Sequence, residues 1–121
     1  MRYMLLCYED SAAWDKAGAA AMEQAMGEAV RLTHELKANG QYVIAAPLHP
    51  TSTATSVRVR DGKRLVTDGP FAETREHLGG FYLIHAKDLD EAIGIAARAP
   101  GARLGTIEIR PVLEIAGCPD R

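Results

Sequence analysis

Aromatic residues and long apolar runs are scarce in this sequence of 121 residues, and each scarcity excludes a class of protein. Aromatic side chains make up only 6% of the chain, so Ala, Val, Ile, Leu and Met must build the core. No apolar run approaches the roughly 18 residues that a membrane-spanning helix needs. The apolar run near the start, over residues 3–8, is too short for a signal peptide. We therefore expect a cytoplasmic protein with no membrane partner.

Neither sign of charge dominates, and cysteines are few. Lys and Arg number 14 and Asp and Glu number 16, so the formal net charge is −2, with both signs spread along the chain. Nucleic-acid binding requires a basic face, so we expect no nucleic-acid partner. Cys7 and Cys118 have no neighbours at metal-ligand spacing, which favours free thiols and leaves a disulfide between them open. The sequence has no glycine-rich phosphate loop or zinc-binding helix, so no cofactor or metal is expected.

What the sequence does contain is an ordered series of strand and helix patterns. Short apolar or alternating runs predict strands, and apolar residues at every third or fourth position predict helices. The Asp61-Gly62 pair predicts a tight hairpin turn. The expected elements are a strand over 3–8, a helix from about 12 to 39 with Gly18 as a candidate break, a strand over 42–46, a hairpin over 55–67, a short helical turn over 72–77, a strand over 81–86, a helix over 88–98 and a strand over 106–115 in which Pro111 favours an edge position. Without the hairpin this order is βαββαβ, which predicts an α+β, ferredoxin-like fold with an inserted β-hairpin, in a single domain over residues 1–121.

The two strands expected at the centre of the sheet, 3–8 and 81–86, are apolar on both faces. Two helices can cover only one face of a four-stranded sheet, so the other face exposes apolar side chains and predicts a partner. A homodimer that packs sheet against sheet is the simplest solution. The alternative is a monomer in which the inserted hairpin folds across the open face.

A long motif lies between the hairpin and the next strand. It reads Asp68-Gly69-Pro70-Phe71-Ala72-Glu73-Thr74-Arg75-Glu76, followed by Leu78-Gly79-Gly80-Phe81-Tyr82. Together with Thr53-Ala54-Thr55-Ser56-Val57-Arg58 and the opening Arg2-Tyr3-Met4-Leu5-Leu6, it resembles the DGPF-motif branch of the YciI-related (YCII domain) family. The resemblance covers nearly the whole chain and implies a dimeric α+β barrel. It implies little about activity, because most of the family has no assigned reaction and a few relatives act without a cofactor, as dehydrohalogenases or muconolactone-isomerase-like enzymes.

The chain departs from the wider family at one point. Some YciI relatives carry a His in the first helix and an Asp before a Pro after the second helix, proposed to work together. By position this sequence has Ala29 or a near neighbour at the first place, and Ala99 before Pro100 at the second. The pair cannot be carried over, so any catalytic role falls to the DGPF segment.

Three carboxylates, Asp68, Glu73 and Glu76, lie close together in that segment. A carboxylate buried at the mouth of a barrel has a raised pKa and can act as a general base. We assign this role to Asp68, with Glu76 or His49 orienting it, since an imidazole titrates near neutral pH.

The remaining residues of the motif are expected to bind the substrate. These are Gly69, Pro70, Phe71 and Glu73, with Arg58, Arg60 or Arg75 as the residue that holds an anionic group. The structural alternative is that Asp68 only forms a turn, the glutamates are solvated and Phe71 fills the core.

Two classes of function follow from these patterns. The first is a cofactor-free enzyme that abstracts a proton from a small metabolite, or eliminates a group from it, in a pocket at the sheet face of the dimer. The second is a non-catalytic dimer that binds a small ligand or supports a regulator.

Overall fold

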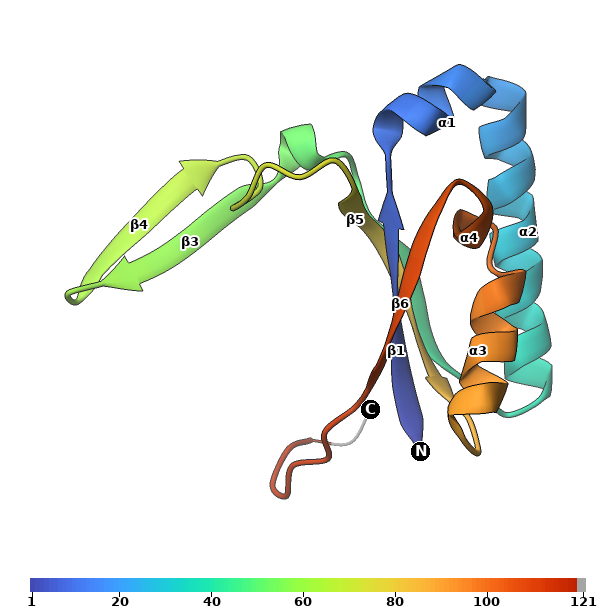
Figure 1. Ribbon diagram of the computed structural model, residues 1–121. Helices are drawn as coiled ribbons and strands as arrows, with labels where there is room; N and C mark the ends of the chain where they lie inside the picture. The colour runs from blue at the N-terminus through green and yellow to red at the C-terminus, as the bar shows by residue number, and fades with distance from the viewer. Residues whose placement is uncertain (120–121) are drawn as a thin grey trace.

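The computed structural model describes residues 1–119 as a mixed α+β arrangement (Figure 1). Its elements are β1 (Arg2–Glu9), α1 (Ser11–Ala17), α2 (Ala19–Ala38), β2 (Tyr42–Pro47), the 3-10 helix η1 (Thr51–Thr53), β3 (Thr55–Arg60), β4 (Lys63–Asp68), β5 (His77–His85), α3 (Leu89–Arg98), α4 (Gly101–Leu104) and β6 (Gly105–Pro111). One antiparallel sheet has the strand order β2-β5-β1-β6, and β3 and β4 form a separate two-stranded sheet. In the part of the chain described, no helix is long and apolar enough to cross a membrane.

Turn chemistry explains where the elements begin and end. Gly18 has a φ of 95° and separates α1 from α2, so the expected helix is interrupted at the predicted break. Asp61 and Gly62 have φ values of 52° and 73° and form the predicted hairpin turn. The prediction of a helical turn over 72–77 was wrong. There the Thr74 hydroxyl donates a 2.6 Å hydrogen bond to the Glu76 carbonyl, a local bond that competes with a helix.

The hydrophobic core lies between the four-stranded sheet and helices α2 and α3 (Figure 1). Leu5 of β1 and Ile84 of β5 belong to one buried cluster with Leu36 of α2 and Ile95 of α3. Leu5, Leu36 and Ile84 are the largest side chains that are fully buried. Side chains alternate along a strand, so the neighbours of Leu5 and Ile84 point to the opposite face of the sheet.

That opposite face is apolar, and within residues 1–119 no helix covers it (Figure 1). Met4 and Leu6 of β1 pair in register with Leu83 and Phe81 of β5, so these four side chains share the face. Ile44 of β2 lies opposite Leu83 and is 48% exposed. We call this surface the open face.

The hairpin of β3 and β4, residues 55–68, projects from the body on the side of the open face (Figure 1). We call it the arm. All of its strand residues except Ser56 are exposed, because the arm does not lie on the sheet. The alternative in which the hairpin folds across the open face of a monomer is therefore wrong.

Candidate functional site

The Asp68-Gly69 pair forms the base of the arm. Asp68 ends β4 opposite Thr55 and is exposed to solvent. Gly69 follows with a φ of 97°, which favours glycine. Its N–H donates to the Ala54 carbonyl at 2.7 Å, and its own carbonyl accepts from the Ser56 hydroxyl at 2.8 Å. These bonds close the arm where it joins the body, in agreement with a turn-forming role for the pair.

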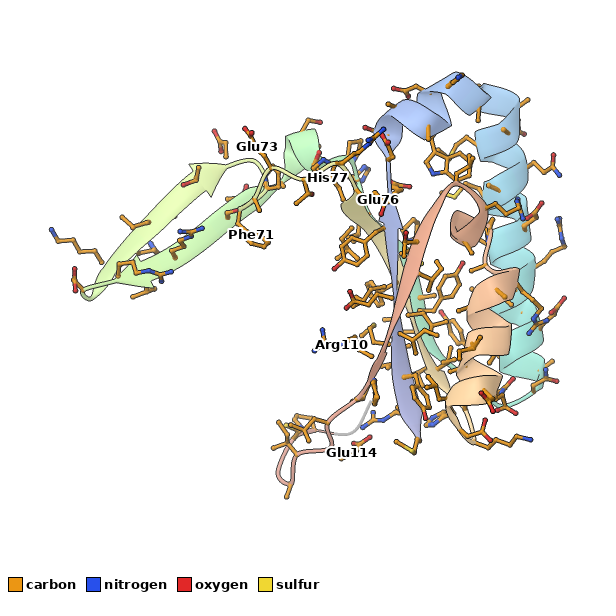
Figure 2. The ribbon with its side chains drawn as sticks, viewed as in Figure 1. Phe71, Glu73, Glu76, His77, Arg110 and Glu114 are labelled. Atoms are coloured by element: carbon orange, nitrogen blue, oxygen red, sulfur yellow. The ribbon has the colours of Figure 1, made fainter. Side chains whose placement is uncertain are left out.

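Phe71 lies on the surface with its neighbours Pro70 and Glu73. The Phe71 side chain is 80% exposed, so the interpretation that it fills the core is wrong. Figure 2 places Phe71 and Glu73 on opposite sides of the segment that joins the arm to β5. Burial of a phenylalanine ring is worth roughly 1.5–3 kcal/mol, which the exposed Phe71 does not contribute. A contact that covered this ring would therefore be favourable.

The second half of the motif is tied to the body of the protein. The Arg75 guanidinium lies 3.5 Å from the carboxylate of Asp10, the residue that caps α1. The Glu76 carboxylate accepts a 3.2 Å hydrogen bond from the Thr106 hydroxyl in β6. Half-buried Glu76 therefore has a structural partner at the edge strand.

The predicted catalytic residues are not joined to one another. His49 and Asp68 are exposed, as is Arg58 on the arm. Among residues 1–119, no hydrogen bond or ion pair links Asp68, Glu76 and His49. The same residues contain no group of three or more His, Cys, Asp or Glu side chains that could hold a metal ion. The catalytic roles of these residues stay predictions.

A cavity of about 340 Å³ lies on the other side of the sheet, between the strands and helices α1 and α2. Its wall is largely apolar and includes Met22, Ala25, Met26 and Ala29 from α2. Concave, mainly apolar sites with few polar groups are the usual form of small-molecule sites. This cavity is therefore the candidate functional site.

Small residues on both sides make room for the cavity. Ala25 and Ala29 line it from α2, and Gly79 and Gly80 line it from β5. A Cβ atom on Gly79 would collide with the side chain of Glu9, and one on Gly80 would lie 3.0 Å from the backbone oxygen of Ala46. Close approach of the β2 backbone thus favours glycine at position 80, and at position 79 the flexible end of the Glu9 side chain occupies the space that a side chain would take.

The wall of the cavity contains one unsatisfied donor. Trp14, the single tryptophan of the chain, is 8% exposed. Its indole Nε1 is buried and has no hydrogen-bond partner among the residues that the structure describes. Such a donor costs about 1–3 kcal/mol when buried. An acceptor atom supplied by a ligand would recover part of that cost.

Glu9 is the one acidic side chain of the wall, and no Lys, Arg or His among the described residues lines it. Burial raises the pKa of the Glu9 carboxyl above its ordinary value. Burial, and then the nearby Glu9 charge, raise the pKa of the Cys7 thiol to about 11. Burial, and then Cys7, raise the pKa of the Tyr82 hydroxyl to about 12. Cys7 and Tyr82 are therefore neutral near pH 7, which leaves Glu9 as the acidic group of the wall that can act as a base.

A second, open depression lies at the far end of the sheet, beside Met1, Gln41 and His85. Some of its polar groups already have partners. The Gln41 amide donates to the Glu91 carboxylate at 2.8 Å, and the amino terminus donates to the Ala86 carbonyl at 3.1 Å. The depression is also wide open, so it encloses a ligand less than the cavity does.

Comparisons with known proteins decide the family. A family model for the YCII-related domain matches residues 1–116. The chain belongs to the YCII-related family. An uncharacterised protein of Rhizobium meliloti (strain 1021) is 38% identical over 117 aligned residues, and the match covers 93% of this chain and 92% of that protein. The predicted family is confirmed, and the name of this relative assigns no activity.

Sequence reasoning missed the cavity of this YCII-related protein because it concentrated on the long motif. Glu9 and Trp14 lie outside that motif, at the end of β1 and in α1. Two signals were available: Glu9 ends a buried strand, and Trp14 is a large side chain in an alanine-rich helix. Ala29 and Pro100 also line the cavity, next to the places where some relatives carry the His and Asp pair.

Proposed function

We propose that this YCII-related protein binds a small, largely apolar and uncharged molecule in the cavity beneath α2, and acts on it through Glu9 without a cofactor. The observation that carries the proposal is the buried, unpartnered Trp14 indole in the wall of an apolar cavity. We infer that a ligand atom that accepts a hydrogen bond from the Trp14 Nε1 would satisfy this donor. A purely hydrocarbon ligand leaves it unsatisfied.

The volume and the wall set the size of the ligand. An engineered cavity of about 150 Å³ binds benzene. At about 340 Å³ this cavity has room for a bicyclic skeleton. Met22 and Met26 line it with flexible, polarisable thioethers, which adapt to irregular apolar shapes.

The charge of the wall sets the charge of the ligand. No cationic side chain among the described residues lines the cavity, and the Glu9 carboxylate repels anions when ionised. A carboxylate or phosphate group would lose its hydration here without gaining a partner. A neutral ketone, lactone or enone fits both the Trp14 donor and the absence of cations.

Proton transfer is the chemistry that such a ligand and Glu9 permit. A carboxylate whose pKa is raised is a stronger base than an ordinary one. In the proposed step Glu9 takes a proton from the carbon next to a carbonyl, and the electron pair of the broken C–H bond moves onto the carbonyl oxygen. The Trp14 N–H donates to that oxygen. Return of the proton to the same or another carbon gives exchange or isomerisation, with no external reactant.

We also infer that the chain is one ferredoxin-like domain that works as a homodimer through the open face. The strand order β2-β5-β1-β6 supports the topology. The uncovered apolar side chains of Met4, Leu6 and Phe81 support a second copy as the partner. Asp68, with Glu76 or His49, is the second candidate catalytic group, favoured by the position of the motif at the base of an arm that projects on the open-face side.

The binding test uses the single tryptophan as its reporter. Camphor, an uncharged bicyclic ketone, is titrated into the protein while Trp14 fluorescence is recorded. We expect saturable binding that is at least about tenfold tighter than that of camphor-10-sulfonate, which adds a negative charge to the same skeleton. By calorimetry, Trp14→Phe should weaken camphor binding about fivefold, the worth of roughly one hydrogen bond. Failure of camphor, 1-decalone and 1-tetralone all to saturate, or a preference for the sulfonate, contradicts the proposal.

A second measurement separates the enzyme from a non-catalytic binding protein. The protein is incubated with 1-tetralone in D₂O, and the loss of the proton signal next to the carbonyl is followed by NMR. We expect faster exchange than in buffer, abolished in Glu9→Gln, while Glu9→Gln still binds the ketone. Binding without accelerated exchange would establish the accessory, ligand-binding alternative instead.

A further inference from the structure

The arm has no support from the rest of its own chain. Every strand residue of the arm except Ser56 is exposed, and β3 and β4 pair only with each other. The hydrogen bonds between Gly69 and Ala54 and between Ser56 and Gly69 hold only its base. A lone two-stranded hairpin is marginally stable in water. We therefore expect the arm to pack against another surface.

One face of the arm is suited to that contact. Val57 lies directly opposite Val66, and Val59 follows on the same face because strand side chains alternate. These three valines are between 58% and 61% exposed. We call them the valine stripe. Arg64, opposite Val59, lies on the same face, whereas the other face carries Arg58, Arg60 and Lys63 with Leu65 as its one apolar residue, so the apolar side chains gather on one face.

Charge favours a second copy of this chain as the occupant. The arm, residues 55–68, holds four basic and two acidic residues, a net charge of +2. The rest of the chain then holds 10 basic and 14 acidic residues, a net charge of −4. The arm of one copy and the body of another therefore attract each other.

The direction and length of the arm also fit a second copy. The arm projects on the open-face side, where a partner's sheet would pack (Figure 1). Packed sheets lie about 10 Å apart, whereas a strand of six residues spans about 20 Å. The arm is therefore long enough to cross the interface and lie along the partner.

We propose that the arm of each protomer clasps a second copy of this chain and buries the valine stripe against it. The inference rests on the proposed homodimer and adds to it a second contact, outside the open face. Phe71, exposed where the arm joins the body, extends the apolar surface that the clasp covers.

Adjacent positions on opposite faces of the arm give a matched test. Val66→Asp places a charge in the valine stripe, and Thr67→Asp places the same charge on the other face. Dimer dissociation constants are measured by analytical ultracentrifugation of the full chain. We expect Val66→Asp to weaken dimerisation by at least about thirtyfold and Thr67→Asp by less than about threefold, as for central and peripheral interface positions.

A second readout does not depend on a variant that folds poorly. The backbone amides of β3 and β4 should exchange with deuterium more slowly as the concentration of the wild-type protein rises through the dimerisation range. Concentration-independent, fast exchange in a solution shown to be dimeric overturns the clasp. Equal dissociation constants for the two variants also overturn it, and leave the homodimer standing. A wild-type chain that stays monomeric overturns the homodimer and the clasp together.

Discussion

At the scale of single residues, Glu9 is the side chain whose position bears most directly on function. It ends the central strand β1, it fits where Gly79 has no side chain, and it faces an apolar cavity. Burial without a cationic neighbour raises the pKa of a carboxyl, because the charged form loses hydration. When Glu9 is ionised, its half-buried position costs the folded state free energy. Such a cost is typical of a functional group rather than of a group that stabilises the fold.

We predict that Glu9→Gln makes the protein more stable at neutral pH. Because the pKa of Glu9 is raised above 4.5 in the folded state, the folded state binds the proton more tightly than the unfolded state. The stability from this group is present below the unfolded pKa and is lost as pH rises through the folded pKa. The Tm of Glu9→Gln should match that of the wild type near about pH 3 and exceed it at pH 7.

The control is Glu23→Gln, which removes an exposed carboxylate from α2. Its Tm should stay within about 1 °C of the wild type at both pH values, as is usual for surface changes. A Glu9→Gln variant that melts below the wild type at pH 7 would show that the carboxylate has a stabilising partner instead.

The two thiols should react at very different rates. Cys118 is exposed, whereas Cys7 is half-buried with a pKa of about 11. The thiolate is the reactive form, so at pH 8 Cys7 should react with a disulfide reagent at least about a hundredfold more slowly than Cys118. Stopped-flow absorbance should show two phases, and Cys118→Ser should remove the fast one. Loss of the slow phase in that variant would refute the assignment.

At the scale of elements, the meeting of β1 and β5 shapes the cavity. The pairing register shifts between Cys7 and Tyr8, where β5 carries Gly79 and Gly80. We predict that Gly79→Ala destabilises the protein by about 1 kcal/mol, the low end for overpacking, because the group that must move aside is the flexible end of the Glu9 side chain. Chemical denaturation measures the change.

Gly94→Ala is the matched control. Gly94 lies within α3, and a Cβ atom there meets nothing within 4 Å. In an exposed helical position alanine is favoured over glycine, so this variant should gain about 0.5–1 kcal/mol. If both variants change stability in the same direction, close packing at Gly79 is not the cause.

Local patterns predicted the elements better than the site. The apolar runs of β1 and β5 and the Asp61-Gly62 turn depend on near neighbours in the sequence, and all are present. The cavity depends on which small residues face each other across the sheet and α2, and that pairing involves residues far apart in the chain. The exposed Phe71 could not be foreseen for a similar reason, because hydrophobicity indicates burial without saying by which chain.

At the scale of the whole molecule, the open face leads us to predict an assembly larger than one chain. We predict that it sediments as a dimer of twice 13.1 kDa. Ile44→Asp on the open face should dissociate it, and Ile93→Asp on α3 should not, although both isoleucines are 48% exposed. Light scattering at micromolar concentration checks the mass. A wild-type mass of 13.1 kDa would contradict the prediction.

The central place of β1 has a consequence for the chain as it is made. Leu5 pairs with Tyr82 on one side and with Ile109 on the other, partners 77 and 104 positions later in the sequence. At about 5–20 residues per second, an apolar strand waits roughly 5–20 s on the ribosome before its second neighbour is synthesised. The four-stranded sheet can therefore be completed only late in synthesis. Sheets that depend on long-range pairing of this kind form slowly. The nascent chain should therefore depend on chaperones that hold unfolded chains, since this apolar strand emerges well before both of the strands that it pairs with.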